Sequence, residues 1–535
     1  MTDFRTQAGV PLKPLYRPED LDGFDYDAKL ADPGEYPFTR GRRIEVGRSS
    51  WIHRELSGEG DPKRSNEQFK YLLDKGQTGL DAIGDMPTMS LIDPDHPMAA
   101  HGVGTTGTSL CRLQDFVDLY DGLPLDKISL SNSLQPSIAL ANLYSAAKRL
   151  GYAPEVLRGS MVHFTLYGED SGYAVHMPSR LRLRLSRDAV EFATREMPKF
   201  HAFLEDCYYI SDGGLDGVEE MALAFVETRR LIREVLARGL DIDSFGPRIA
   251  ILLNCHMDFF ETVAKVRATR RLFARMMKED YGARDPRTLA VNVASHTSGL
   301  SMTAQQPVNN IVRGASQALS LAMAGVQAIE ISTFDEAYRT PSPEAHLVGL
   351  RTQQIVAMET NVSQVADPLA GSYFIESLTD EMEQRIWAMV EEIEAAGDPI
   401  ELADNGYFRD IFMRAADRRA EQMANGELMQ VGVNCHQMAE AEDTLLKDVA
   451  ERKMEPDYAR IEAIKAFRAQ RDLPRVKAAL QTVRERAADE NHNIMPEMVA
   501  AAEADATMGE IAGVLRQAYG GPYDPYGLVT SPLEQ

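Results

Sequence analysis

The stretch LAVNVASHTSGLSMTAQQPVNNIVRGASQALSLAMAG, residues 289–325, joins a short apolar run, a polar loop and an amphipathic run without interruption. The first run, 289–295, has the length of a buried strand, and the last has the spacing of a helix that ends at a glycine. Asn309 or Asn310 is the expected N-cap of that helix. A strand, a loop and a helix in this order predict one unit of a parallel α/β sheet.

The same alternation extends from about residue 75 to 340. Apolar runs of strand length lie at 127–133, 160–167, 249–255 and 327–333, and helical spacing is found at 138–151 and 221–239. Residues 180–187, RLRLRLSR, alternate as an exposed strand would. No G-x-G-x-x-G or Walker loop follows the first strand, so a closed barrel is favoured over a nucleotide-binding doubly wound sheet.

The expected fold class is therefore α/β, a TIM (β/α)8 barrel with an N-terminal arm and a C-terminal helical extension. We assign the arm to residues 1–70, the barrel to 71–400, and the helical extension to 401–535. The last residues, GGPYDPYGLVTSPLEQ, are expected to form a loose tail.

Charge and composition exclude several classes of protein. There are 57 basic and 81 acidic residues, a net charge of -24, which repels nucleic acid and anionic membranes. No run of about 18 apolar residues and no signal-like N-terminus is present, so a cytoplasmic protein is expected. The four cysteines form no CxxC pair, and Cys255, His256 and Asp258 lie too close in sequence to face one ion, so no metal site is predicted.

The polar loop after residue 295 is the first candidate for function. A helix cap explains one asparagine, but it does not explain His296, Thr297, Ser298, Gln305 and Gln306. A solvated loop is the plain alternative. In a barrel, however, the segments that leave the carboxyl ends of the strands carry the chemistry, so this loop is expected to line a site.

Several long segments resemble the large catalytic subunit of the adenosylcobalamin-dependent acyl-CoA mutases, the methylmalonyl-CoA mutase family. They are HTSGLSMTAQQPVNNIVRGASQAL, GVQAIEISTFDEAY, FGPRIAILLNCHMDFF and RTQQIVAMETNVSQVADPLAGSYFIESLTDEME, and the similarity runs from about residue 36 to 520. The resemblance implies an isomerase whose barrel is threaded by CoA and capped by cobalamin. A 5'-deoxyadenosyl radical would remove a hydrogen from the acyl group, and the thioester carbon would then migrate.

The resemblance also carries residue roles. Glu336 matches a glutamate that faces the adenosyl ribose. Arg54 and Arg248 match arginines for CoA and substrate, and Arg43 and Arg48 belong to a basic segment, RGRRIEVGR, that could meet CoA phosphates as part of a CoA-contacting arm. A solvated arm is the alternative for that segment. The other positions expected on the substrate side are Ile52 and Ala250, and those expected on the cofactor side are Gly84, Thr106, Gly172, Asp212, Gly299, Gln327 and Arg339.

Departures from the family pattern point to a different substrate. Leu56 stands where methylmalonyl-CoA mutase has a tyrosine, and the family arginine for the free carboxylate aligns near Gly172. Without a cation, burial of a second carboxylate would cost several kcal/mol. Tyr209 replaces the histidine that polarises the thioester carbonyl, His296 replaces a glutamine, and Asp81 replaces a serine and could bind a hydroxyl or an amine.

The family's cobalamin motif, D-x-H-x-x-G, does not occur in this sequence. A small cobalamin-binding subunit is therefore the expected partner, in a hetero-oligomer, and the resemblance also admits a G-protein chaperone. The predicted function is a mutase acting on a branched or hydroxylated acyl-CoA. Two alternatives stay open at this point, a non-catalytic CoA-binding or assembly subunit and a cobalamin-dependent eliminase or aminomutase acting on a free acid.

Overall fold

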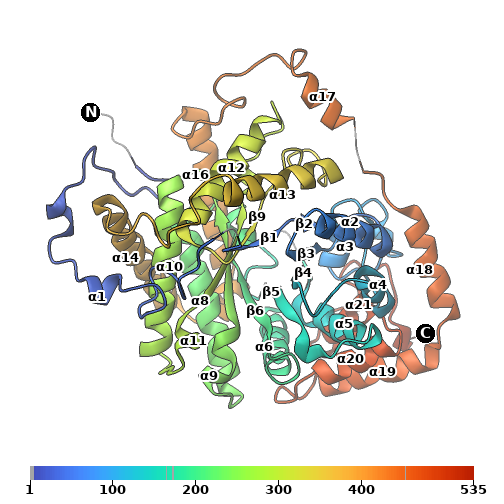
Figure 1. Ribbon diagram of the computed structural model, residues 1–535. Helices are drawn as coiled ribbons and strands as arrows, with labels where there is room; N and C mark the ends of the chain where they lie inside the picture. Colours follow the sequence, from blue (N-terminus) through green and yellow to red (C-terminus); the bar gives the residue numbers. More distant parts are fainter. Residues whose placement is uncertain (1–4, 48, 164, 171–173, 452–453, 535) are drawn as a thin grey trace. The chain divides into compact units, whose positions relative to one another are not determined.

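The computed structural model describes residues 5–47, 49–163, 165–170, 174–451 and 454–534 (Figure 1). The chain forms two compact units. The first comprises Met1–Glu55, Glu205–Arg230 and Asp241–Arg452, and the second comprises Leu56–Leu204, Leu231–Leu240 and Lys453–Gln535. Among the described residues, no helix combines the length and the apolar character needed to cross a bilayer.

The strands form one sheet in the order β1-β9-β8-β7-β6-β5-β4-β3-β2. β1 and β2 stand at the two ends of this order, yet only Glu55 separates them in the chain. They are two parts of one strand that pairs in parallel with β9 through its first part and with β3 through its second. The sheet thus closes on itself, and the fold is the expected TIM-type α/β barrel. The strands are β1 (Ile52–Arg54), β2 (Leu56–Ser57), β3 (Gly79–Ile83), β4 (Ser129–Ser133), β5 (Arg158–His163), β6 (Phe200–Asp206), β7 (Ile249–Cys255), β8 (Asn292–Thr297) and β9 (Ala328–Glu330).

Buried ion pairs join the helices of the first unit. On α10, Arg267 is fully buried, and its Nη2 lies 2.6 Å from Oε1 of Glu376 on α14, which is equally buried. Figure 1 shows α10 and α14 next to each other. Removing one partner of such a pair would leave an uncompensated charge in the core. The helices are α1 (Tyr26–Lys29), α7 (Cys207–Ser211), α9 (Ile242–Phe245), α10 (Phe259–Glu279), α11 (Pro286–Leu289), α12 (Asn309–Ala324), α13 (Pro343–Met358), α14 (Tyr373–Ala396), α15 (Pro399–Asp404), α16 (Tyr407–Asn425) and α17 (Thr444–Ala450), while α8 (Gly217–Ala237) extends beyond this unit.

In the second unit, the C-terminal helices pack against helices from the first half of the chain. α20 and α21 contact α5, whose alanine-rich faces are almost wholly buried. Small side chains allow this close helix approach. The helices are α2 (Pro62–Asp74), α3 (Met86–Met89), α4 (Leu113–Tyr120), α5 (Pro136–Arg149), α6 (Ser179–Glu196), α18 (Tyr458–Gln470), α19 (Leu473–Arg486), α20 (Met495–Glu503) and α21 (Met508–Ala518).

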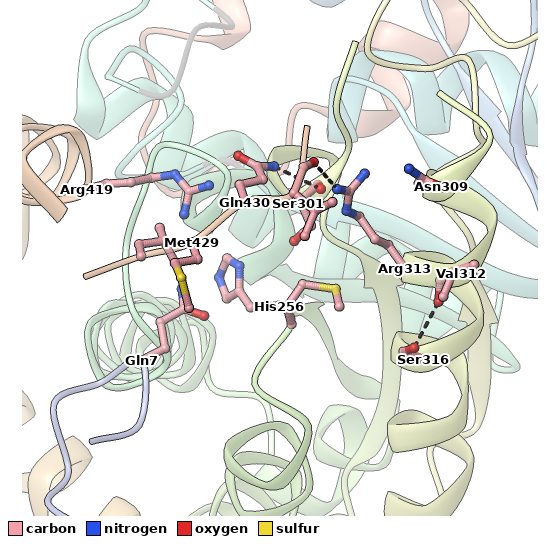
Figure 2. A pocket seen from close by; sticks show the side chains of 13 residues that line it. Gln7, His256, Ser301, Asn309, Val312, Arg313, Ser316, Arg419, Met429 and Gln430 are labelled. Atoms are coloured by element: carbon pink, nitrogen blue, oxygen red, sulfur yellow. Dashed lines mark hydrogen bonds between the residues drawn. The ribbon is translucent and has the colours of Figure 1, made fainter. Parts of the chain in front are cut away.

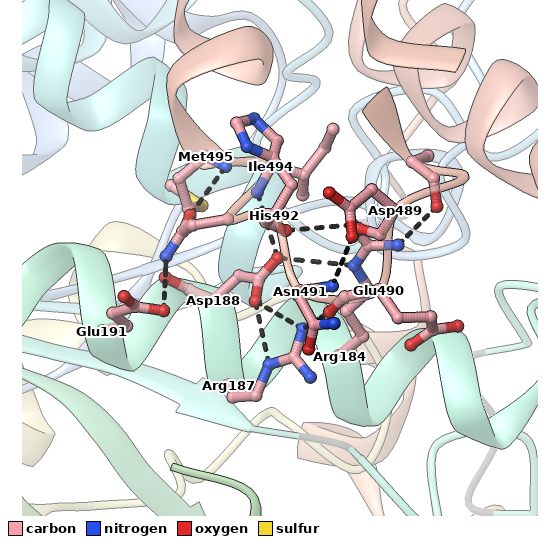
Figure 3. Close-up of polar contacts among 12 residues, drawn as sticks. Arg184, Arg187, Asp188, Glu191, Asp489, Glu490, Asn491, His492, Ile494 and Met495 are labelled. Carbon is pink, nitrogen blue, oxygen red and sulfur yellow. Dashed lines mark hydrogen bonds and ion pairs between the residues drawn. The ribbon is translucent and has the colours of Figure 1, made fainter. Parts of the chain in front are cut away.

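The segment 180–187 is helical, so its prediction as an exposed strand is wrong. It lies in α6, where Arg184 is buried and donates to the carbonyl oxygens of Asp489 at 2.6 Å and His492 at 3.0 Å. Its neighbour Arg187 donates to the carbonyl of Glu490 at 3.0 Å (Figure 3). Arg and Leu both favour helices, and carbonyls distant in sequence satisfy the buried guanidinium groups.

The expected loose tail is also packed, which corrects a second prediction. The Asp524 carboxylate accepts backbone N–H bonds from Tyr526 at 3.1 Å, Leu528 at 2.6 Å and Val529 at 2.8 Å. Gly513 on α21 leaves room for the Tyr523 ring, since a β-carbon there would lie 2.3 Å from it. Composition indicated flexibility, but a capped turn and a ring seated on a glycine hold the tail in place.

Candidate active site

Polar residues of the first unit lie in a row across four strands. Arg54 in β1 is in register with Glu330 in β9, Glu330 with His296 in β8, and His296 with Asn254 in β7. Register partners in parallel strands point to the same face of a sheet. Arg54 and Glu330 also form a buried ion pair, with Nη1 3.2 Å from Oε1.

This row faces the inside of the barrel. Glu55, the residue after Arg54, accepts a 3.1 Å hydrogen bond from Nε2 of Gln353 on α13 and approaches Gly349 of the same helix. Helices cover the outside of a TIM barrel, so Glu55 points outward. Because side chains alternate along a strand, Arg54 points inward with the rest of the row.

His296 lies against an aromatic ring at the carboxyl end of β8. The Tyr208 ring centroid is 4.3 Å from that of His296, at an interplanar angle of 41°. Nδ1 of His296 lies 2.7 Å from the carbonyl oxygen of Thr297. A carbonyl can only accept, so Nδ1 of His296 carries a proton and donates it in this contact.

Glu336 lies close to the same histidine, in the loop after β9. Its Oε2 accepts from the backbone N–H of Thr333 at 2.9 Å, and its Oε1 lies 3.4 Å from the Ser332 hydroxyl, which is also 3.4 Å from Nδ1 of His296. Burial raises the pKa of the Glu336 carboxyl, and the nearby His296 opposes that rise. A raised carboxyl pKa with a specific neighbour is a frequent property of functional sites.

Gly299 opens a small polar cradle between these groups. A β-carbon at this position would lie 3.1 Å from Oδ2 of Asp212, 3.5 Å from Oε1 of Glu336 and 3.5 Å from the Tyr208 hydroxyl. Asp212 is held in place through Oδ1, which accepts from Asn254 Nδ2 at 2.7 Å and from the Ser298 hydroxyl at 2.9 Å. The cradle can therefore accept hydrogen bonds from a ligand that carries hydroxyl groups.

The loop after β8 is fixed to the loop after β9. α12 begins at Asn309 with Val308 as its N-cap and without a side-chain cap bond, so the predicted asparagine cap is wrong. Asn310 instead donates from Nδ2 to the carbonyls of Thr303 at 2.8 Å and Phe334 at 2.9 Å. The asparagine thus joins two loops of the site, which is a tertiary role that a helix-start pattern does not reveal.

In the second unit, Leu56 in β2 is in register with Asp81 in β3. Asp81 is buried, and its Oδ1 accepts at 3.1 Å from both the backbone N–H and the hydroxyl of Ser133. At the carboxyl end of β3, Gly84 is packed against Thr88, while Thr106 accepts from the backbone N–H of Met86 at 3.2 Å. The structure therefore brings Leu56 and Asp81 together.

Other predicted residues lie at the amino ends of the strands. Arg248 precedes β7, and its pKa is lowered by burial and by the charges of Arg287 and Arg42, so three arginines gather here. Arg42 in turn donates to the side chain of Asn292 at the start of β8. Such a cluster in an acidic protein suits an anionic ligand.

The remaining predicted residues have varied positions. Gln327 lies just before β9, at the opposite end of that strand from Glu336, and its Oε1 accepts from the Val293 N–H at 2.8 Å. Arg43 is exposed and pairs with Glu45. Arg48 and Gly172 lie outside the described residues. Ile52 begins β1, Ala250 is buried in β7, Arg339 donates to the Thr340 carbonyl, and Tyr209 is half-buried in α7, where its N–H donates to Asp206.

Sequence reasoning missed several residues of the cluster. Asn254 is the last residue but one of an apolar run that was predicted correctly as a strand, so its place near a carboxyl end was a usable signal. Tyr208 gave no such signal. It follows β6, and the charged residues of that strand interrupt the apolar pattern by which a strand is predicted. The residues missed are Tyr208, Asn254, Glu330 and Ser332.

The barrel, with a polar cluster at the carboxyl ends of its strands, defines a TIM-barrel enzyme. A family model described as methylmalonyl-CoA mutase matches residues 5–521. The chain is 34% identical to the large subunit of 2-hydroxyisobutanoyl-CoA mutase from Aquincola tertiaricarbonis, over 97% of this chain and 92% of that protein. It is 33% identical to methylmalonyl-CoA mutase from Rhizobium meliloti and 30% identical to that from Escherichia coli, over 72% and 74% of those proteins and 97% and 99% of this chain. The chain belongs to the methylmalonyl-CoA mutase family of cobalamin-dependent acyl-CoA mutases, which are isomerases.

Proposed function

We propose that the chain is the large subunit of a mutase that rearranges the carbon skeleton of a branched or hydroxylated acyl-CoA lacking a second carboxylate. The observation that carries the proposal is the similarity to the 2-hydroxyisobutanoyl-CoA mutase large subunit over 92% of that protein. The pairing of Leu56 with Asp81 supports it. A carboxylate beside an apolar residue can accept a hydrogen bond from a hydroxyl, whereas it would repel a second carboxylate.

The cofactor in this proposal is adenosylcobalamin, held mainly by a small cobalamin-binding subunit. The relative's name, a large subunit, supports such a partner. The cradle around Gly299 fits the adenosyl part, because Asp212 and Glu336 can accept hydrogen bonds from ribose hydroxyls and no β-carbon fills the space. When bound, the cofactor supplies an organic radical that removes and returns hydrogen. A G-protein chaperone stays a prediction from the sequence.

In this mechanism the residues of the chain bind the acyl-CoA substrate and orient it. Arg248 and Arg42 attract the CoA phosphates, and Asp81 orients the substrate hydroxyl. The Tyr209 phenol donates to the thioester carbonyl oxygen, which stabilises charge that develops there as the thioester carbon migrates. The His296 ring, oriented by the hydrogen bond from Nδ1 to the Thr297 carbonyl, separates the substrate from the cradle. The inward-facing row excludes water, which protects a reactive intermediate.

The test is reconstitution of the chain with the small cobalamin-binding subunit and adenosylcobalamin. We expect isomer formation from 2-hydroxyisobutanoyl-CoA and none from methylmalonyl-CoA, measured by chromatography and mass spectrometry. A substrate-dependent electron paramagnetic resonance signal should accompany turnover. Binding of CoA without that signal would support a non-catalytic subunit, and turnover of a free acid without CoA binding would support an eliminase or aminomutase.

A further inference from the structure

A second pocket lies in the first unit, apart from the polar cluster. It has a volume of about 440 Å³ and lies between Met257 after β7, the first turns of α12, and residues 428–431 after α16. None of Tyr208, Asp212, His296 or Glu336 lines it. Figure 2 shows Arg419 on one side and Arg313 on the other, with Gln430 and Ser301 between them.

The two arginines of this pocket lack carboxylate partners among the described residues. No Asp or Glu oxygen lies within 4 Å of either guanidinium. Arg313 donates to the Thr303 hydroxyl at 2.8 Å and to the Val431 carbonyl at 2.8 Å, and Arg419 donates to the Leu300 carbonyl at 3.3 Å. Burial lowers the pKa of both groups, and at Arg419 the more distant charge of Asp212 partly opposes this. Partly buried cations with neutral acceptors retain attraction for an anion.

Several other partly or fully buried arginines in the same unit do meet carboxylates, although Arg270 donates to the carbonyls of Ala324 and Gly325 instead. Arg267 and Arg271 meet carboxylates on α14, and Arg229 meets Glu394 at 2.9 Å. The protein has 24 more acidic than basic residues, so partners for a cation are abundant on its surface. Two guanidinium groups left without carboxylates around one pocket therefore indicate a place for an external anion.

The rest of the pocket is apolar, although it is open to water. Met257 is 46% exposed, Val312 67% and Met429 72%. Next to them lies His256, 2.9 Å from the Ser211 hydroxyl, and burial together with the charges of Lys265 and Arg419 holds its pKa well below its usual range. Exposed apolar side chains around a concave site mark a binding surface.

We propose that this pocket binds a small carboxylate with a short hydrocarbon body. The carboxylate would accept from Arg313 and Arg419, and the hydrocarbon would cover Met257, Val312 and Met429. A volume of about 440 Å³ lies within the range of roughly 300 to 1,000 Å³ that is typical of small-molecule sites. A free carboxylate is favoured over a larger polyanion because only two cations converge here among the described lining residues.

Hexanoate, hexanol and hexylammonium are matched probes for this proposal. Each would be titrated into the intact chain by ligand-observed NMR, with coenzyme A present to occupy the barrel site. We expect hexanoate to bind at least tenfold more tightly than hexanol and hexylammonium not to bind. Arg313→Gln and Arg419→Gln should each weaken hexanoate binding at least fivefold. Arg414→Gln, an exposed position on the same helix as Arg419, should leave binding unchanged.

Three results would overturn the proposal. Hexanoate could fail to bind, or it could bind equally to the chain with both arginines replaced. It could also fail to bind while the two replacements weaken association with the small cobalamin-binding subunit, in which case this face is a protein interface. The neutral and cationic probes separate charge recognition from simple apolar binding.

Discussion

Leu56 and Asp81 stand side by side on the adjacent parallel strands β2 and β3, in direct register. Because the pair combines an apolar surface with a hydrogen-bond acceptor, it suits a branched acyl group that carries a hydroxyl. Asp81→Asn should lower kcat/KM for 2-hydroxyisobutanoyl-CoA by roughly 10- to 100-fold, since the stronger charged acceptor is lost. The asparagine oxygen can still accept from Ser133, and Ser133→Ala is the control for that contact. Equal losses in the two variants would contradict a direct role of Asp81.

Tyr208 and Tyr209 are neighbours on α7, so they point in different directions, and each has a separate expected role. Tyr209→Phe should slow turnover by roughly 10- to 100-fold with little change in CoA affinity, because a donor to the thioester carbonyl is lost. Tyr208→Phe keeps the ring that contacts His296 and should reduce turnover less. Single-turnover kinetics and CoA titration measure both. Full activity in Tyr209→Phe would remove that phenol from the mechanism.

The pH profile of the reaction should have an acidic limb, a fall on its acidic side, because Glu336 becomes protonated there. Burial raises its pKa above the ordinary 4.5, so the carboxylate form, which accepts from ribose hydroxyls, becomes populated only as pH rises through that raised value. Glu336→Gln should weaken cofactor binding by roughly tenfold, the loss of one charged hydrogen bond, and remove this limb. Cofactor affinity measured between pH 5 and 8 tests it. An unchanged pH profile in the variant would assign the limb to another group.

Glu55 should make stability depend on pH. It is fully buried against Gln353, and burial raises its pKa well above 4.5. The folded state therefore holds the proton more tightly than the unfolded state does, so its contribution to stability is full below pH 4.5 and declines as pH rises through the folded pKa. Glu55→Gln cannot ionise, so its stability relative to the native chain should grow with pH, by roughly 1 to 3 kcal/mol.

Urea unfolding at pH 5 and pH 8 measures that difference. The control is Glu67→Gln, because Glu67 is an exposed glutamate on α2. A constant difference between Glu55→Gln and the native chain across this range would contradict a buried, protonated Glu55.

Arg184 should hold residues 487–494 against α6. It donates to carbonyls of that segment (Figure 3) and, at 2.9 Å, to the Tyr519 hydroxyl. Arg184→Met would leave several buried acceptors unpaired and should cost roughly 3 kcal/mol. Arg180→Gln changes an arginine of the same helix whose side chain is 70% exposed, and should cost less than about 0.5 kcal/mol. Hydrogen exchange across 487–494 should rise in the first variant and stay constant in the second.

The alternation of apolar and amphipathic segments was sufficient to predict the barrel. Buried parallel strands are often continuous apolar runs, and β7 (IAILLNC) shows this pattern plainly, while β4 and β8 were predicted from shorter apolar stretches. Four strands were not predicted. β1, β2, β3 and β6 carry charged or polar residues such as Arg54, Asp81 and Glu205, which interrupt an apolar run. Such residues are tolerated in the barrel because ion pairs and hydrogen bonds satisfy them inside it.

The candidate site, like the strands, could be predicted only in part. The polar loop after residue 295 could be singled out from sequence because a polar segment after a strand is informative in a barrel, and Glu336 was singled out by the resemblance to the family. The contact of Tyr208 with His296, and the cradle that Gly299 opens, could not. They join segments roughly 90 residues apart, and no local pattern records which distant side chains meet.

The sequence by itself determined the class of fold, the family and the chemistry of the strand ends, because periodicity and motifs are local properties of the chain. Only the tertiary structure decided that residues 180–187 form a helix, that the C-terminal tail is packed, and that Leu56 meets Asp81. Each of these depends on partners far away in sequence. Burial against such partners changes the free energy of a segment by more than its own propensity does.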